Sequence, residues 1–369
     1  MTFKEAIRKA LSDEMSSDPK VVLFGEDVGV YGGCFKVTGD LYKEHPNQVI
    51  DTPVSEEGFT GMAVGAAMMG MRPVIEIMYA DFFTLIFDPI VNHAAKTHFM
   101  SGGQFCCPIT VRLPEGSGTG HGAQHTQSPE ALFQNSAGLK MVAPSCPSDA
   151  YHLLRAAIRD NNPVLFFEHK MLYDMEGDIK DEALPLGKAK ILKKGRDITI
   201  VSYSRAVQTA LETARLLEEK GIFATIVDLC TLKPLDRTTI LEEVRNTGRV
   251  AIIQDPNGVG GIGAQVCSEI CSDPKTFDSL KSPVIQIGGK CTPVPFSKDL
   301  EKSTIPNARD CAERITSTIK GGRNQRPFQR NPGNQQSRSH PYKVRNLGTQ
   351  EPFLLLLLLS LEEEMSSMH

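Results

Sequence analysis

Short apolar runs alternate with longer amphipathic stretches along most of this chain, and that alternation limits its possible folds more than any other feature. A short apolar run bounded by glycine or proline is typical of a buried strand, whereas apolar residues at helical spacing indicate a helix. Strands that alternate with helices predict an α/β fold, a mostly parallel sheet with helices on both faces. The predicted strands cover 21–24, 73–78, 108–112, 141–144, 164–168, 197–202, 224–228, 249–253 and 283–287, and the predicted helices cover 3–15, 58–70, 81–100, 148–160, 205–220, 236–246 and 261–271.

Two domains are expected, because 369 residues exceed the usual length of one. The stretch 170–186 is acidic and contains Pro185, so it is the predicted linker between a first domain at 1–180 and a second at 186–318. The remaining 321–369 begins with a stretch rich in Arg, Asn, Gln, Gly and Pro. This composition predicts a disordered tail.

The composition excludes several classes of partner. A formal net charge of −4 gives no general attraction to nucleic acid, and no apolar stretch is long enough to span a membrane. The nine cysteines include no C-x-x-C pair, so they predict buried thiols in a reducing compartment and not a disulfide framework. The amphipathic helix predicted over 3–15 indicates that no signal peptide precedes the first domain.

The segment 51–67 places two carboxylates, Glu56 and Glu57, at the head of a stretch rich in glycine and alanine. Small residues such as Gly61 and Gly65 let a helix pack closely against a neighbour, so a carboxylate at its head can be shielded from water. Burial raises the pKa of a carboxyl group, which suits one that shares a proton with a ligand nitrogen. The alternative interpretation is a pair of acids that the helix dipole favours in the first turn.

Several further motifs follow one another in a fixed order. They are 24–28 (FGEDV), 31–38 (YGGCFKVT), 96–103 (KTHFMSGG), 124–128 (QHTQS), 158–163 (IRDNNP) and 228–236 (DLCTLKPLD). Together with 51–67, and over roughly 1–318, they resemble the beta subunit of the thiamine-diphosphate-dependent decarboxylase component of 2-oxo acid dehydrogenase complexes. The resemblance implies a pyrimidine-binding domain of transketolase type followed by a transketolase C-terminal domain.

The resemblance gives Glu56 a defined role. Its carboxyl group hydrogen-bonds the aminopyrimidine ring of thiamine diphosphate, and the shared proton helps to generate the nucleophilic carbon of the cofactor. Glu57 is expected to point elsewhere. The resemblance also implies that the ring of Phe82 lies against the aminopyrimidine and that Met78 lines the same pocket. From periodicity alone, the alternative for Phe82 is ordinary core packing.

His125 follows the glycine-dense loop 115–122 and matches a family histidine that faces the cofactor and helps to transfer the acyl group to a lipoyl arm. A histidine titrates near neutral pH, so it can donate and accept protons there. One alternative is an exposed loop histidine without a role. Another is a zinc site that uses His121 and His125, four residues apart, but the glycines of the loop oppose the helix that such a site requires.

The turn after the predicted helix 148–160 matches a monovalent-cation loop of the same family. The resemblance implies a structural potassium ion, because carbonyl oxygens at a helix C-terminus carry partial negative charge. The alternative is simple helix termination, with Pro163 as a stop signal. The implied ligands are Ile109, Ala157, Ile158, Asp160 and Asn162.

The glycines of 258–263 fit a dinucleotide-binding fingerprint, but two features oppose that interpretation. Asp255 to Asn257 separate the glycines from the predicted strand, and no acid ends the next strand, 283–287, to bind a ribose. The stretch 254–263 also departs from the family pattern, so the resemblance does not extend to the contact surface of the second domain.

The chain lacks half of a thiamine diphosphate site. In the family, a Gly-Asp-Gly turn followed by Asn-Asn holds magnesium and the diphosphate, and this sequence contains no Gly-Asp-Gly. A phosphate ester without a metal and a helix N-terminus binds weakly. The resemblance therefore implies a second polypeptide, the alpha subunit of an alpha2-beta2 heterotetramer. The alpha subunit would hold Mg²⁺, with the cofactor between the two chains.

The implied reaction is the thiamine-dependent oxidative decarboxylation of a 2-oxo acid, with acyl transfer to a lipoyl acyltransferase core. Pyruvate is the favoured substrate, and acetoin and branched-chain 2-oxo acids stay open. A rival of another class is a non-catalytic beta-like assembly protein, which the intact Glu56 and His125 oppose. The favoured location is a bacterial cytoplasm, and a plastid stroma or a mitochondrial matrix are the alternatives.

Overall fold

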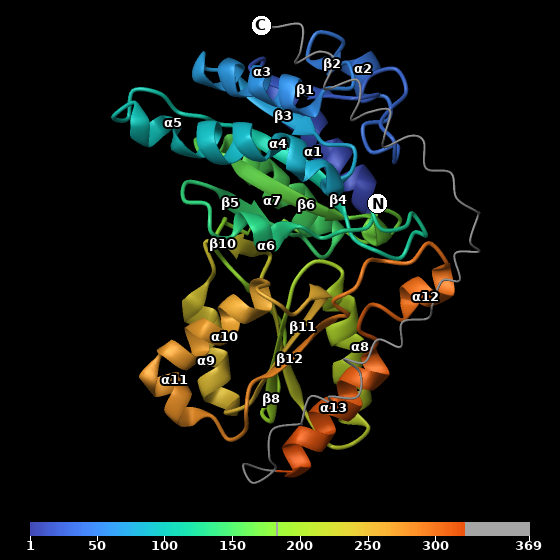
Figure 1. The fold of residues 1–369 in the computed structure, drawn as a ribbon, viewed down its shortest axis with the longest axis vertical. Helices are drawn as coiled ribbons and strands as arrows, with labels where there is room; N and C mark the ends of the chain where they lie inside the picture. Colours follow the sequence, from blue (N-terminus) through green and yellow to red (C-terminus); the bar gives the residue numbers. More distant parts are fainter. Residues whose placement is uncertain (182–183, 322–369) are drawn as a thin grey trace, which may run out of the picture. The chain divides into compact units, whose positions relative to one another are not determined.

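The computed structural model describes residues 1–181 and 184–321, and the predicted tail lies outside the described residues from 322 onward. The described part contains one seven-stranded and one five-stranded sheet, each with helices on both faces (Figure 1). This arrangement confirms the predicted α/β fold. Every helix in this part is too short or too polar to cross a bilayer.

The first sheet is parallel except at one edge. Its strand order is β10-β5-β6-β4-β3-β1-β2, and β10 pairs antiparallel with β5. Because β10 comes from the second half of the chain, this edge joins the two halves. The strands are β1 (Val21–Gly25), β2 (Val49–Asp51), β3 (Arg72–Glu76), β4 (Thr110–Glu115), β5 (Lys140–Val142), β6 (Val164–His169) and β10 (Thr231–Lys233).

The side chains of the first sheet alternate between two helical layers, as the two-residue period of a strand requires. Leu23 and Val74 belong to one buried cluster, and their neighbours Val22 and Ile75 belong to the other. The first layer is α1 (Phe3–Ser17) and α7 (Pro147–Arg159); the second is α3 (Glu56–Met68), α4 (Phe83–Asp88) and the π-helix η2 (Pro89–Ala94).

The start of α1 shows how the local sequence sets a helix boundary. Thr2 precedes the helix, and its hydroxyl accepts the N–H of Glu5, while the Glu5 carboxylate accepts the N–H of Thr2. This reciprocal capping satisfies two N–H groups that the first turn leaves without helical partners. Ile7 and Leu11, four residues apart, then face the core.

The second sheet has the order β12-β11-β8-β9-β7, and only β7 runs antiparallel to its neighbour. Helices α8 and α13 cover one face, and α9 and α10 cover the other. The strands are β7 (Lys190–Lys193), β8 (Ile198–Ser202), β9 (Ala224–Asp228), β11 (Val250–Asn257) and β12 (Ile285–Gly289). The main helices are α8 (Ala206–Glu218), α9 (Arg237–Thr247), α10 (Ile262–Ser272), α11 (Pro274–Ser279) and α13 (Ala308–Gly321).

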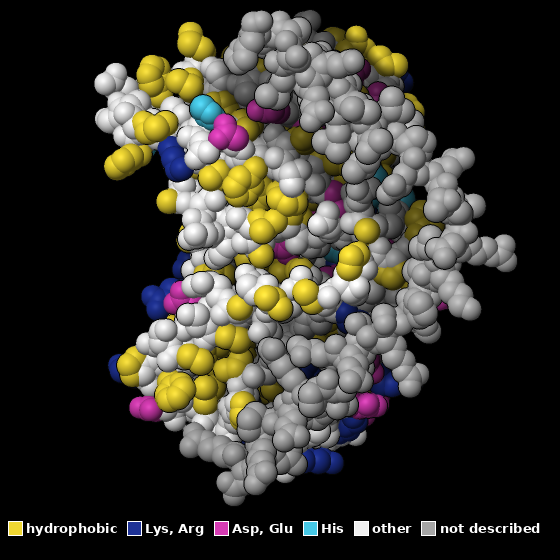
Figure 2. Space-filling view, viewed as in Figure 1, with side chains coloured by type: hydrophobic (Ala, Val, Ile, Leu, Met, Phe, Trp, Pro, Cys, Tyr) yellow, Lys and Arg dark blue, Asp and Glu magenta, His cyan; other side chains and the backbone are white. Residues whose placement is uncertain are grey.

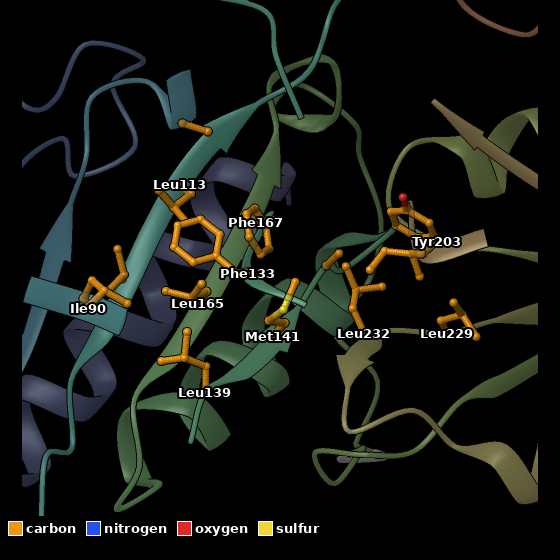
Figure 3. Packing of buried hydrophobic residues seen from close by; sticks show 14 of the residues in the cluster. Ile90, Leu113, Phe133, Leu139, Met141, Leu165, Phe167, Tyr203, Leu229 and Leu232 are labelled. Atoms are coloured by element: carbon orange, nitrogen blue, oxygen red, sulfur yellow. The ribbon is translucent and has the colours of Figure 1, made fainter. Parts of the chain in front are cut away.

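One hydrophobic cluster runs from the first sheet to the second (Figure 3). Phe133 is fully buried beside Leu113 and Phe167 of the first sheet, and the cluster continues to Leu229 and Leu232. Burial of each large apolar side chain contributes about 1.5–3 kcal/mol. Residues 1–323 accordingly form one compact unit.

A buried triad of charges joins three neighbouring strands of the first sheet. Arg112 of β4 is fully buried, and its Nε and Nη2 donate to Glu168 of β6 at 2.7 and 2.8 Å. Its Nη1 donates to Glu76 of β3. The hydroxyl of Tyr173 also donates to Glu168, at 2.9 Å. The three charged side chains therefore have hydrogen-bond partners within the protein.

The helix predicted over 81–100 is observed as a continuous helical run from Phe83 to Met100, but it is not one regular α-helix. The structure has four short segments there, because Pro89 has no N–H group and its ring hinders a regular helix. A π-helical turn absorbs the irregularity. The segments are η1 (Ala80–Phe82), α4, η2 and α5 (Ala95–Met100); other short helices are α2 (Leu41–Glu44), α6 (Glu130–Phe133), η3 (Lys170–Leu172) and α12 (Lys298–Lys302).

The nine cysteines are all free, which confirms that they form no disulfide framework. The expectation that they are buried is wrong for Cys106, Cys271 and Cys291, which are exposed. Cys107, Cys230 and Cys311 are buried.

Candidate active site

The predicted catalytic residues lie near the carboxyl edge of the first sheet, the edge at which parallel α/β sheets bind their ligands. Strand β1 ends at Gly25 and β3 ends at Glu76, so Glu26 follows β1 directly and Met78 lies two residues after β3 at the same edge. Strand β4, the neighbour of β3, leads into the glycine-dense loop that precedes His125. Residues far apart in the sequence thus approach one another.

Glu56 is the first residue of α3 and is only 7% exposed, whereas Glu57 is exposed, as expected. The carboxyl group of Glu26 lies close by, is also 7% exposed, and has one oxygen without a hydrogen-bond partner. Burial raises the pKa of Glu26, and the charges of Glu56 and Asp27 raise it further. Two neighbouring buried carboxyl groups favour a bound proton or a ligand group that donates hydrogen bonds.

The rings of Phe82, His125 and Tyr79 form one aromatic cluster. The ring centroid of Tyr79 lies 4.6 Å from that of His125 and 5.9 Å from that of Phe82, and Phe82 lies 5.7 Å from His125. All three pairs meet edge to face, which aromatic rings prefer. Phe82 is half-buried and also packs against the core cluster, so it combines core packing with a place beside His125. Burial, together with Cys34, raises the pKa of Tyr79 to about 12.

The loop before His125 is not helical, which removes the geometry of the zinc alternative. Gly116 has a φ of 88°, and a Cβ there would lie 2.1 Å from the ring of His169, so only glycine fits. Among the residues that the structure describes, no group of three metal ligands includes His121 or His125. Burial and the charge of Lys170 lower the pKa of His121.

The residues expected to bind potassium lie at the opposite, amino edge of the sheet, where Ile109 precedes β4 and the others surround the end of α7. Arg72 already contacts part of this set. Its Nη1 donates to the carbonyl oxygens of Ile158 and Asp160 at 3.0 and 3.1 Å. The carboxylate of Asp160 pairs with Lys140. Two carbonyls assigned to the ion therefore face a guanidinium group.

Glu26, Tyr79 and Asp81 were not predicted as site residues. Asp81 is 7% exposed, and its Oδ1 accepts the N–H groups of Thr126 and Gln127, which follow His125. The available signal for Glu26 was its place directly after a strand that ends in glycine. Asp81 gave no local signal, because its partners lie 45 and 46 residues away.

The glycines of 258–263 do follow a strand directly. Strand β11 runs to Asn257, so one reason given against a dinucleotide site is wrong. The side chain of Gln254 supplies a better one: its Oε1 accepts the N–H of Gly263 at 2.7 Å, and its Nε2 donates to the carbonyl of Asn257 at 2.8 Å. A buried amide thus occupies the N-terminus of α10, where a pyrophosphate would bind.

A buried group of two carboxylates and a thiol, Asp149, Asp228 and Cys230, also occurs in the described part of the chain. Lys190 pairs with Asp149, and the hydroxyl of Ser145 donates to Asp228, so the group is satisfied without an ion. Burial raises the pKa of Asp228 to about 7, and the charge of Asp149 adds to the shift.

A cavity of about 630 Å³ lies between the loop and the second half of the chain. Thr126, Gln127 and Asp255 line it, whereas Glu56, Phe82 and His125 do not. The predicted site residues are therefore not the walls of this cavity.

Family models match two consecutive parts of the chain. The transketolase pyrimidine-binding domain matches residues 1–176, and the transketolase C-terminal domain matches residues 187–311.

Curated relatives cover most of the chain. A pyruvate dehydrogenase E1 component subunit beta from Rickettsia felis is 43% identical over 318 residues, which are 85% of this chain and 97% of the relative. The mitochondrial subunit beta-2 of that component from Oryza sativa subsp. japonica is 44% identical, with 84% of each chain covered. The beta subunit of an acetoin:2,6-dichlorophenolindophenol oxidoreductase from Cupriavidus necator is 41% identical, over 88% of this chain and 98% of the relative.

Among solved structures, a split-gene transketolase described as an inactive beta4 tetramer superimposes with a TM-score of 0.72. It is 23% identical and covers 87% of this chain and 98% of its own. Together with the two family models, this likeness confirms the predicted transketolase-type architecture.

Proposed function

The chain belongs to the family of pyruvate dehydrogenase E1 beta subunits, and we propose that it is the beta half of an enzyme that oxidatively decarboxylates pyruvate and passes the acyl group to a lipoyl arm. The observation that carries this proposal is the buried Glu56 beside Glu26, near the sheet edge where Phe82 meets His125. The family depends on thiamine diphosphate, so the site must accommodate that cofactor.

The residues present fit the aminopyrimidine half of thiamine diphosphate. Glu26 has a buried oxygen without a partner, and Glu56 is shielded from water, so both can accept hydrogen bonds from an aminopyrimidine. The half-buried Phe82 and Met78 offer it an apolar wall. When bound, the cofactor supplies a nucleophilic carbon and an electron sink for decarboxylation. Glu56 shares a proton with the pyrimidine ring, and His125 exchanges a proton during acyl transfer.

We propose that another chain binds the diphosphate half of thiamine diphosphate. The sequence has no Gly-Asp-Gly turn, so we assign the diphosphate and Mg²⁺ to an alpha subunit. A lipoyl acyltransferase core then receives the acyl group.

The surface of the first half supports a partner chain. Figure 2 shows hydrophobic side chains gathered over α4 and α5. The exposed apolar side chains of these two helices include Leu85, at 47%, and Phe99, at 89%. Soluble monomers rarely expose large apolar patches. Gly61 and Gly65 of α3 face open space, since a Cβ on either would meet no atom within 4 Å. The expected close packing of these glycines is therefore absent among the residues that the structure describes, and we assign it to the alpha subunit of an alpha2-beta2 heterotetramer.

Acetoin is the second candidate substrate. The relatives from Rickettsia felis and rice are named for pyruvate and are 43% and 44% identical to this chain. The acetoin relative is almost as similar, at 41% identity. Rates with pyruvate, acetoin and a branched-chain 2-oxo acid, measured on one reconstituted complex, separate these substrates. These relatives come from bacteria and from plant mitochondria, and we propose the bacterial cytoplasm or the mitochondrial matrix as the location.

Potassium fits its implied site in part. Arg72 already donates to the carbonyls of Ile158 and Asp160, but a carbonyl oxygen has a second lone pair. We propose that the ion binds beside Arg72 and stabilises the turn after α7. The melting temperature should then be higher in potassium chloride than in choline chloride at equal ionic strength. Equal melting temperatures in the two salts would show that Arg72, and not a potassium ion, stabilises the turn.

Glu56→Gln, in the chain reconstituted with an alpha subunit, tests the proposed function. The amide cannot share a proton as the carboxyl group does, so turnover of pyruvate should fall by about 10²-fold or more. Glu57→Gln is the matched control, because Glu57 is adjacent but exposed. Normal turnover with Glu56→Gln would remove this residue from the mechanism. An assembled wild-type complex without turnover would favour the non-catalytic alternative.

A further inference from the structure

The glycine-dense loop that leads to His125 is held by side chains from other parts of the chain. Its left-handed glycines, among them Gly118 and Gly120, permit the turns but place the loop outside any helix or strand. Its backbone N–H and C=O groups therefore need partners elsewhere. Three buried charged residues supply them: Asp81, Lys170 and Glu301.

Glu301 reaches the loop from the second half of the chain. It lies on α12 and is 1% exposed. Its Oε1 accepts the N–H of Gly118 at 2.6 Å, and its Oε2 accepts the N–H of Gly120 at 2.9 Å. A Cβ at Gly120 would lie 3.2 Å from the side chain of Lys298, so α12 packs directly on the loop. Hydrogen bonds to a carboxylate are roughly twice as strong as those between neutral groups.

Lys170 binds the loop at His125 itself. Its Nζ donates to the carbonyl oxygen of His125 at 2.9 Å, and its side chain is 5% exposed. Burial lowers the pKa of Lys170 to about 8, and the charges of Asp81, Glu115 and Glu301 oppose that shift. The lysine and the two neighbouring anchors thus also stabilise one another electrostatically.

Asp81 binds the loop just after the histidine, at the N–H groups of Thr126 and Gln127. The loop is therefore fixed on both sides of His125. Glu301 binds the glycines before the histidine, and Asp81 binds the two residues after it. The ring of His125 is held 4.6 Å from the ring of Tyr79.

We propose that Glu301 is a positioning residue for His125. By holding the N–H groups of Gly118 and Gly120, it fixes the path of the loop and keeps the imidazole beside Tyr79. The inference rests on the proposed role of His125 in acyl transfer. It makes the site depend on both halves of the chain, because the first half carries the histidine and α12 carries its anchor.

The geometry requires two acceptor oxygens at position 301. In Glu301→Gln the shape is kept, but one oxygen becomes an NH₂ group, a donor that faces a backbone N–H. One of the two hydrogen bonds is then lost. Asp299 lies on the same short helix with a side chain that is 95% exposed, so Asp299→Asn is a matched control.

The test uses the full chain assembled with its alpha subunit, with pyruvate and a lipoyl domain as substrates. Glu301→Gln should lower kcat for lipoyl acylation by about 10–100-fold, because a displacement of about 1 Å at a reacting group has an effect of that order. KM for pyruvate should change little, and decarboxylation with an artificial electron acceptor should fall much less. Asp299→Asn should leave all three values unchanged.

Hydrogen exchange provides a readout that does not depend on activity. In the assembled complex, at least one of the amides of Gly118 and Gly120 should exchange about tenfold faster in Glu301→Gln than in the wild type, while the melting temperature stays close to that of the wild type. Wild-type exchange rates in the variant would overturn the proposal. So would faster exchange with unchanged lipoyl acylation. Faster exchange in a complex whose wild type has no decarboxylase activity would support the anchor and overturn the proposed function instead.

Discussion

Glu56 and Glu57 are neighbours in the sequence, but α3 buries only the first of them. Glu26 lies beside Glu56, and burial raises its pKa. Two nearby buried carboxyl groups favour a bound proton or a ligand group that donates hydrogen bonds. At the scale of single residues, the chemistry of this site therefore depends on which side chain the fold removes from water.

Asp228 lies outside the candidate site, so it shows how burial affects the pH dependence of stability without a contribution from catalysis. Its pKa is raised by burial to about 7, well above the value near 3.9 of an unfolded chain. Between these values the folded state binds the extra proton, so the contribution of Asp228 to stability should fall as the pH rises from about 4 to about 7 and then stay level. About three pKa units correspond to at most about 4 kcal/mol.

Asp228→Asn should remove this contribution. The difference in melting temperature between about pH 5 and about pH 8 should therefore change in the variant, with the relative gain at the higher pH. The exposed Asp299→Asn should behave as the wild type does. An unchanged difference in Asp228→Asn would show that Asp228 is ionised in the folded chain well below neutral pH.

At the scale of elements, the charges of Arg112, Glu76 and Glu168 connect β4 with its neighbours β3 and β6. Arg112→Met should destabilise the chain by about 3–5 kcal/mol, because it leaves two buried carboxylates without their guanidinium partner. Chemical denaturation measures the change.

Arg215→Met is a suitable control for Arg112→Met, since Arg215 also pairs with two glutamates, Glu212 and Glu219, but at the surface. Surface ion pairs contribute little, so this variant should unfold nearly as the wild type does. If both variants lose the same stability, burial is not what makes the Arg112 triad important.

Most strands and long helices could be predicted to within a few residues, because their signals are local. The helix predicted over 58–70 is observed at Glu56–Met68, and the strand predicted over 224–228 is observed with the same bounds. The place of β10 in the first sheet could not be predicted, because strand pairing across the chain leaves no periodic signal. The pattern over 81–100 did predict a helix, but Pro89, which lacks an N–H donor, begins a π-helical turn inside it that leaves no periodic signal.

The candidate site was predictable where it is carried by short motifs, as at Glu56 and His125. It was not predictable where partners come from distant elements. Glu301 binds glycines 181 and 183 residues before it, and no local pattern marks such a pair. The contacts of Arg72 with the predicted potassium turn span 86 and 88 residues and were hidden for the same reason.

At the scale of the whole molecule, the two halves share one hydrophobic cluster, and Glu301 connects the second half to the candidate site in the first. No residue within 1–181 or 184–321 covers the face of α3 at Gly61 and Gly65. A small-residue face allows another helix to approach closely, since the distance between packed helices depends on the side chains at the contact.

Gly65→Leu should separate folding from assembly. Leucine meets open space in the isolated chain and favours a helix by about 1 kcal/mol over glycine, so the melting temperature should stay the same or rise. Association with the alpha subunit, measured by analytical ultracentrifugation, should weaken strongly. Glu313→Leu on the exposed side of α13 is the control for an added leucine and should assemble normally. Normal assembly of Gly65→Leu would exclude this face from the interface.

Calorimetric titration with thiamine diphosphate and Mg²⁺ tests the shared site most directly, with this chain alone and with the chain assembled with an alpha subunit. We expect binding to the assembled complex only, because this chain offers acceptors for the aminopyrimidine and no Gly-Asp-Gly turn for the diphosphate. Tight binding of the cofactor by the isolated chain, with decarboxylation of pyruvate, would contradict a site divided between two polypeptides.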